Sequence, residues 1–158
     1  MNSEQTRREF ITNTGTAASA ATLLGALTSL LQGCGGGSPT SASSAPPLPT
    51  VRATMNGGAA TLAIDAGSPL AAVGGAALVL GAGGPLLVAH TAPDTFVALT
   101  AICTHQGCTI SGFTDQRYVC PCHGSNFDTS GRVLNGPAAM ALRQFPTSFA
   151  SGVLTITL

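Results

Sequence analysis

The chain has 158 residues, with six basic and six acidic side chains, so its formal net charge is zero. Binding to nucleic-acid phosphates needs a surplus of basic residues, and this composition therefore excludes a nucleic-acid binder that works through a basic face. Only 4 % of the residues are aromatic and none is tryptophan, so a core must be largely aliphatic. The chain also holds five cysteines and three histidines, and their spacing carries most of the functional information.

The N-terminal part, residues 1–33, is predicted to be an export signal. Arg7 and Arg8 precede a stretch without charge, and the run Thr6-Arg7-Arg8-Glu9-Phe10-Ile11 resembles the twin-arginine signal, whose route exports folded proteins. An ordinary secretory signal with a chance arginine pair is the alternative. The weakly apolar run 17–31 would form a helix about 22 Å long, which is shorter than the roughly 30 Å hydrocarbon core of a bilayer. We therefore expect a signal peptide here and no membrane span.

Cys34 closes the run Leu31-Gln32-Gly33-Cys34, which resembles the cleavage box of a bacterial lipoprotein. Lipid attachment would account for the odd number of thiols in an exported protein; a small-residue cleavage site with an incidental cysteine is the alternative. Residues 35–50 are Gly-, Ser- and Pro-rich and cannot bury enough apolar surface to fold. The expected organisation is a signal peptide over 1–33, a lipidation site and tether over 34–50, and a folded domain over 51–158. The protein is thus expected to be periplasmic and anchored to the membrane by lipid.

The folded part has the pattern of an all-β domain. Short runs of Val, Leu, Ile, Thr and Ala alternate with Gly and Pro, which is typical of small antiparallel strands. No helical periodicity of useful length follows Leu31. We expect a small β-sandwich or barrel, in which His90 is a structural histidine at the end of a strand. The predicted strands are 60–64, 76–80, 86–90, 96–100, 117–120 and 153–158.

Two loops, 103–108 and 120–127, gather four cysteines and two histidines and indicate a metal centre. A structural zinc site could use two cysteines and two histidines, but its paired ligands are usually separated by two to four residues. A single residue separates Cys103 from His105, which suits zinc poorly. A binuclear centre, in which different ions take the cysteines and the histidines, removes this difficulty.

The loops read Cys103-Thr104-His105-Gln106-Gly107-Cys108 and Cys120-Pro121-Cys122-His123-Gly124-Ser125. Both resemble, without gaps, the motifs of the Rieske iron-sulfur proteins, which hold a [2Fe-2S] cluster with two cysteines and two histidines. Gly136-Pro137-Ala138 stands where the Rieske subunits of quinol:cytochrome c reductases have a loop that covers the cluster. The resemblance is therefore greatest to these disulfide-containing subunits, and it implies a Rieske-type β fold with two cluster-binding loops.

The resemblance also implies a role for individual residues. The cluster ligands would be Cys103, His105, Cys120 and His123, and a disulfide would join Cys108 to Cys122. Ser125 matches a serine that donates a hydrogen bond to a cluster sulfide, whereas Phe127 stands where high-potential members have a tyrosine donor. Histidine ligation places such potentials at about −150 to +300 mV, and retention of one donor predicts a value below that of members with both.

The expected function is one-electron transfer by an exported, tethered protein, with one [2Fe-2S] cluster per chain and a cytochrome or other redox protein as partner. An alternative is the Rieske subunit of a multi-subunit quinol:cytochrome c reductase, where quinol takes part, or of a periplasmic oxidase. A structural zinc-binding module is the third hypothesis. The sequence shows no nucleophile or acid–base group that would make the chain catalytic by itself.

Overall fold

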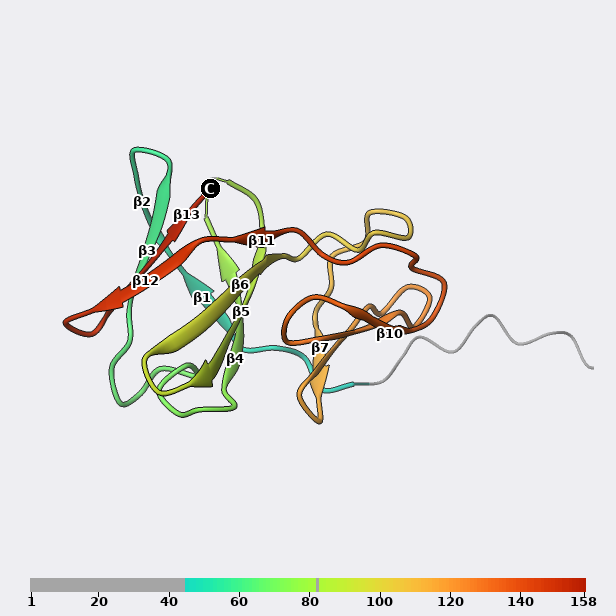
Figure 1. The fold of residues 1–158 in the computed structure, drawn as a ribbon, viewed down its shortest axis with the longest axis horizontal. Coiled ribbons are helices and arrows are strands. Elements are labelled where there is room, and N and C mark those ends of the chain that lie inside the picture. The colour runs from blue at the N-terminus through green and yellow to red at the C-terminus, as the bar shows by residue number, and fades with distance from the viewer. Residues whose placement is uncertain (1–44, 82) are drawn as a thin grey trace, which may run out of the picture. The chain divides into compact units, whose positions relative to one another are not determined.

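The computed structural model describes residues 45–81 and 83–158 of the chain. Over these residues it contains thirteen β-strands and no helix, so the expectation of an all-β fold is confirmed. The strands form three sheets (Figure 1). The expected export signal and lipidated Cys34 lie outside the described residues. In the part that is described, no helix is long and apolar enough to cross a membrane.

The central sheet has five strands in the order β1-β4-β5-β6-β11. Residues 86–90 of β5 are all buried, which requires cover on both faces of the sheet. Leu87 and Ala89 contribute to one core, while Leu86 and Val88 contribute to the other. The bounds of these strands are β1 Thr50–Arg52, β4 Ala76–Leu80, β5 Leu86–Ala92, β6 Thr95–Thr100 and β11 Gln144–Phe145.

The two remaining sheets cover these two faces, as their positions on either side of the central strands in Figure 1 indicate. One sheet has the order β12-β13-β3-β2 and shares the core that contains Leu62, Leu154 and Ile156. The other has the order β10-β9-β8-β7 and shares the core that contains Tyr118 and Phe127. Their bounds are β2 Thr54–Asn56, β3 Ala59–Ala63, β12 Thr147–Ala150 and β13 Val153–Thr157, and β7 Gly112–Thr114, β8 Arg117–Val119, β9 Asn126–Asp128 and β10 Val133–Asn135.

The segment just before β1 packs on the domain, although the sequence assigns it to the tether. Pro47 forms an isolated bridge with Gly112, and the N–H of Leu48 donates to the carbonyl of Ser111 at 2.7 Å. The Leu48 side chain is buried in the same core as Tyr118 and Phe127. The folded part therefore begins upstream of the expected start at Val51, because the Leu48 side chain packs in the core although its neighbours in sequence are polar or proline.

Candidate metal centre

The first motif, residues 103–108, forms a closed loop between β6 and β7. The N–H of Cys103 donates to the carbonyl of Cys108 at 2.8 Å, and the N–H of Gly107 donates to the carbonyl of Cys103 at 2.9 Å. Gly107 has a φ of +75°, in the left-handed region that glycine adopts without steric cost. Short-range backbone bonds thus set the path of the chain on both sides of His105.

The second motif, residues 120–125, repeats this arrangement between β8 and β9. The N–H of Cys120 donates to the carbonyl of Ser125 at 2.8 Å, and the N–H of Gly124 donates to the carbonyl of Cys120 at 3.1 Å. Gly124 has a φ of +70°, close to that of Gly107. The two loops therefore present a cysteine at the same place in the same kind of turn.

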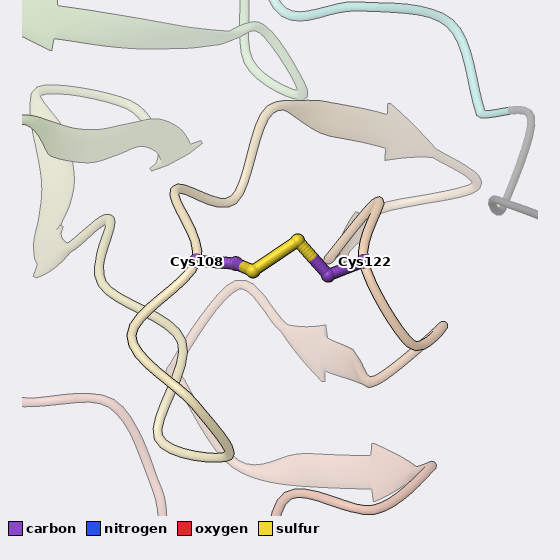
Figure 2. The surroundings of a disulfide bond; sticks show 2 residues. All are labelled: Cys108 and Cys122. Atoms are coloured by element: carbon purple, nitrogen blue, oxygen red, sulfur yellow. A yellow bond between two sulfur atoms is a disulfide. The ribbon is translucent and has the colours of Figure 1, made fainter. Parts of the chain in front are cut away.

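A disulfide joins the two loops (Figure 2). The Cys108 and Cys122 sulfurs are 2.09 Å apart, and the corresponding Cα atoms are 6.5 Å apart, which confirms the expected pairing. The Cys120 sulfur lies within 4.8 Å of both of these sulfurs. These three cysteines are nevertheless not a metal site, because a sulfur in a disulfide is not available as a thiolate ligand.

The other two cysteines of the motifs, Cys103 and Cys120, are free thiols and buried, with 3 % and 1 % of their surface exposed. Burial raises the pKa of the Cys120 thiol above its ordinary value, and interaction with the neighbouring Cys103 raises this pKa further, although backbone hydrogen bonds act in the opposite direction. The two loops thus bring their first cysteines together.

The histidines also meet across the two loops. The ring centroids of His105 and His123 are 4.8 Å apart, and the rings are nearly perpendicular at 87°. The Nδ1 atom of His105 is buried and has no hydrogen-bond partner among the described residues. A buried polar atom without a partner costs free energy of about 1–3 kcal/mol, and coordination of a metal ion would remove that cost.

These features fit an iron-sulfur cluster held by two sulfurs and two ring nitrogens. Burial favours the neutral form of the Cys120 thiol, but a bound metal ion would remove the proton of a thiol ligand and supply the opposite charge. The unpartnered Nδ1 of His105 offers a nitrogen ligand next to this pair. The residues present therefore suit the group that the sequence motifs imply.

A third segment, residues 136–140, packs on both loops. The N–H of Ala138 donates to the Oγ atom of Ser125 at 3.1 Å, in a buried contact. The Thr104 hydroxyl donates to the carbonyl of Met140 at 2.6 Å. The expected covering role of Gly136-Pro137-Ala138 is consistent with these contacts. The bond between Thr104 and Met140 has no counterpart in the sequence analysis, because nothing in either residue type marks a partner 36 positions away.

Ser125 and Phe127 lie on the buried side of the second loop and of β9. Both side chains have 0 % of their surface exposed. Phe127 pairs across the sheet with Tyr118, whose hydroxyl is buried without a hydrogen-bond partner among the described residues. Burial also raises the pKa of Tyr118 above its ordinary value, so the phenol stays protonated. Nothing in the sequence marks this tyrosine as part of the site, since an aromatic residue in a strand is most simply a core residue.

Comparison with known proteins supports the motif-based interpretation. Residues 66–146 match the family model of the Rieske [2Fe-2S] domain. A cytochrome b6-f complex iron-sulfur subunit from Cyanothece is 36 % identical over 69 residues, which cover 43 % of this chain and 37 % of that protein. The corresponding subunit from Synechococcus elongatus is 44 % identical over 45 residues, covering 28 % of this chain and 25 % of that protein. The chain therefore spans about a third or less of these relatives.

Solved structures with the same fold include the cyanobacterial plasma membrane Rieske protein PetC3 from Synechocystis, with a TM-score of 0.52 and 27 % identity. The match covers 61 % of this chain and 99 % of that one. A naphthalene 1,2-dioxygenase matches with a TM-score of 0.51 at 17 % identity, covering 61 % of this chain and 25 % of that one, and shows a similar fold alone.

The matched region includes both cysteine–histidine loops, the disulfide between them and the covering segment. Its family description implies one [2Fe-2S] cluster, and the paired thiols and the unpartnered ring nitrogen of this structure fit that cluster. The chain belongs to the Rieske [2Fe-2S] domain family, whose members transfer electrons.

Proposed function

We propose that this protein is a one-electron carrier whose cluster is held by Cys103, His105, Cys120 and His123. The observation that carries the proposal is the convergence of two buried free thiols and two imidazoles from loops that a disulfide joins. When bound, a Rieske cluster takes up and releases one electron at a potential raised by its histidine ligands. The chain would supply the ligands, keep water from the cysteine sulfurs and determine which side of the cluster a redox partner can approach.

The two imidazoles provide the route for the electron to a partner. His123 is exposed and His105 is half-buried, whereas both free thiols are buried. A partner that docks at the tip of the loops would therefore approach the imidazole edges first. Hydrogen-bonding of these rings to a partner would bring the donor and acceptor close without uncovering the thiols.

The surface near these loops suits an apolar contact with a redox partner. Ile102 precedes Cys103, and Met140 is the last residue of the covering segment 136–140; 40 % and 65 % of their respective surfaces are exposed. Leu134 in β10 is 50 % exposed. Charges are few in the whole chain, so docking would depend more on apolar burial than on long-range electrostatic steering.

The site is proposed to work outside the bacterial inner membrane. Residues 1–33 would direct export, Cys34 would carry the lipid, and residues 35–50 would connect the anchor to the domain, with Leu48 already packed on it. The partner would be a cytochrome or another redox protein. Export in the folded state suits a domain whose cluster is assembled before translocation.

A second candidate is a subunit of a larger quinol-oxidising complex. It is favoured by the covering segment at Ser125 and by relatives that are named as iron-sulfur subunits of cytochrome b6-f complexes. Isolation of the protein from its native membrane in mild detergent distinguishes the two. Recovery of a cytochrome b with it supports the complex, and recovery of a soluble c-type cytochrome alone supports the carrier.

Replacement of one proposed ligand tests the function directly. The purified protein is expected to contain two iron atoms and two acid-labile sulfides per chain and to give a rhombic electron paramagnetic resonance signal after reduction. Cys103→Ser and His105→Ala should each lose this signal, because a ligand is removed. Cys34→Ser is the matched control, since this cysteine lies outside both motifs; it should keep the signal. Zinc in the purified protein, with no iron, would contradict the proposal.

Phe127→Tyr is expected to raise the reduction potential. A tyrosine at this buried position of β9 adds a hydroxyl donor near the thiols that share its core, and a donor stabilises the more negative, reduced state. If this hydrogen bond is stronger by about 1 kcal/mol in the reduced state, the shift is about 40 mV for one electron. Protein-film voltammetry measures it.

Ser125→Ala provides the opposite comparison. The Ser125 oxygen accepts from the N–H of Ala138, so its own hydrogen is free to be donated to the cluster. Loss of that donor should lower the potential by a similar amount.

For Phe127→Tyr, a potential that is unchanged or lower, with the cluster signal intact, would show that no donor acts from position 127.

A further inference from the structure

A second site lies away from the cluster loops, at the β5–β6 hairpin. A cavity of about 260 Å³ opens between this hairpin, the loop after β3 and β12, and its lining includes His90, Phe96, Phe149, Asp65 and Asp94. No residue of either cysteine–histidine loop or of the covering segment lines it. Figure 1 shows β5 and β6 with the sheet that contains β12 on one side and β7 and β10 on the other.

His90 is a buried ring with one unsatisfied nitrogen at this cavity. Its surface is 9 % exposed, its Nδ1 donates to the carbonyl of Leu70 at 2.9 Å, and its ring stacks on Phe96 with centroids 4.3 Å apart. Because a carbonyl oxygen only accepts, the Nδ1 atom carries the hydrogen, and Nε2 of the neutral ring is an acceptor. Nε2 is buried and has no partner among the described residues. The ring thus lacks one hydrogen-bond donor.

The carboxylates at this cavity lack cationic partners. In residues 45–81 and 83–158 the acidic side chains are Asp65, Asp94, Asp115 and Asp128. Asp115 pairs with Arg117 at 3.0 Å, and Asp128 accepts three hydrogen bonds within its own turn. Asp65 and Asp94 are exposed and both line the cavity, whereas no arginine does. One carboxylate oxygen of Asp65 accepts a hydrogen bond from the N–H of Gly67 at 3.0 Å, and neither aspartate has an ion-pair partner among the described residues. Two of the four acidic side chains of the described residues therefore lie at one cavity.

Two aromatic rings complete the wall. Phe96 and Phe149 have centroids 4.9 Å apart at an angle of 50°, and aromatic faces attract cations as well as alkyl groups. The combination of carboxylates, aromatic faces and a hydrogen-bond acceptor matches a positively charged donor with an apolar stem. It does not match an anion as well, because two carboxylates and no arginine line the cavity.

We propose that this cavity binds an organic cation, an ammonium or guanidinium group on a short apolar stem. Asp65 and Asp94 balance its charge, Phe96 and Phe149 contact its stem, and one N–H is donated to Nε2 of His90. Since Nε2 is covered in the structure, binding requires a wall residue to shift. We expect Phe149 to be that residue, because it is half-buried and lies on β12, an edge strand of its sheet. The site could take a free amine or a lysine or arginine side chain of a partner.

Titration of the isotope-labelled, cluster-containing protein with n-butylammonium, followed by nuclear magnetic resonance, tests the proposal. Saturable shifts are expected at His90, Phe96 and Phe149. The variant Asp65→Asn/Asp94→Asn should bind at least tenfold more weakly. Asp115→Asn removes an exposed carboxylate elsewhere and is the matched control; its affinity should equal that of the parent. These shifts do not depend on the cluster, so a failure of the proposed electron-transfer function leaves the outcome of this test unaffected.

Neutral and anionic probes of the same size decide whether charge matters. Equal binding of n-butanol or butyrate, no saturable shift with n-butylammonium, or equal affinity of the double aspartate variant would overturn the proposal. A short peptide with one lysine separates the two sources of the cation. Tighter binding of the peptide than of n-butylammonium identifies a partner side chain as the ligand, and weaker binding identifies a free amine; either result supports a cation site.

Discussion

Replacement of both Cys108 and Cys122 by alanine is expected to lower the free energy of unfolding by about 3 kcal/mol, the value for a closed loop of about 15 residues. The two cysteines are 14 positions apart, and in the described residues no backbone hydrogen bond joins loop 103–108 to loop 120–125. The disulfide is thus the covalent connection between the two loops that contain the proposed ligands. Its loss should also accelerate release of the cluster.

Guanidinium unfolding, followed by both circular dichroism and visible absorption, measures this effect. A reducing agent supplies the matched control, because it should destabilise the parent protein to a similar extent and leave the double alanine variant unchanged. If the variant retains the parent's unfolding midpoint and cluster lifetime, the covering segment alone is sufficient to hold the loops together.

Gly136→Ala is expected to have an effect of similar size through a steric clash. Gly136 has a φ of +97°, and a Cβ atom there would lie 2.5 Å from Cα and 3.0 Å from the backbone nitrogen of Ser125. These are backbone atoms that cannot rotate away, so the covering segment or the second loop must move. Overpacking of this kind costs about 1–3 kcal/mol, in addition to about 1–2 kcal/mol for the unfavourable φ.

Gly84→Ala separates the two costs. Gly84 has nearly the same φ, +96°, but no atom would lie within 4 Å of an added Cβ. This variant should therefore show only the backbone cost, and its reduction potential should equal that of the parent. Gly136→Ala should unfold at a lower guanidinium concentration than Gly84→Ala, and its potential should fall, because the clash displaces Ser125. Equal stability of the two variants would mean that the loops accommodate the extra atom.

These expectations follow from three segments that hold the site in different ways. The two cysteine–histidine loops close on themselves through backbone bonds, the disulfide connects them, and residues 136–140 contact each of them through one hydrogen bond. We expect a site held in this way to change little in shape when a bound cluster gains one electron, because the protein supplies the orientation of such a group.

The longer strands could be predicted, because strands buried in a core are runs of apolar and β-forming residues that Gly and Pro interrupt. The prediction of 76–80 agrees with β4, and the predictions of 86–90 and 96–100 lie within β5 and β6. Most of the strands of two to four residues, namely β1, β7, β9, β10, β11 and β12, were not predicted, since so few residues rarely show a period; β8 is the exception, lying within the prediction of 117–120. The turn between β7 and β8 uses Asp115 and Gln116, both with positive φ, and contains no glycine to mark it.

The short strand β2 was also not predicted, although the sequence carries a turn signal next to it. Gly57 and Gly58 both have positive φ and join β2 to β3 as a two-residue turn, and consecutive glycines between strand-forming residues are typical of such hairpins. Leu48 shows the opposite case. Its proline- and serine-rich surroundings predict a tether, and only the core shared with Tyr118 and Phe127 explains its burial.

The two cysteine–histidine motifs were enough to identify the Rieske family and to predict the Cys108–Cys122 disulfide, because their resemblance to the family's motifs has no gaps. In each motif a glycine four positions after the first cysteine permits the tight turn. Which residues pack against the two loops, and which residues line the cavity at His90, could be learned only from the tertiary structure. The contacts of Ser125 with Ala138 and of Thr104 with Met140, and the convergence of His90, Asp65 and Asp94 on one cavity, join residues far apart in the chain. Such contacts arise from the packing of sheets, which short-range sequence patterns do not encode.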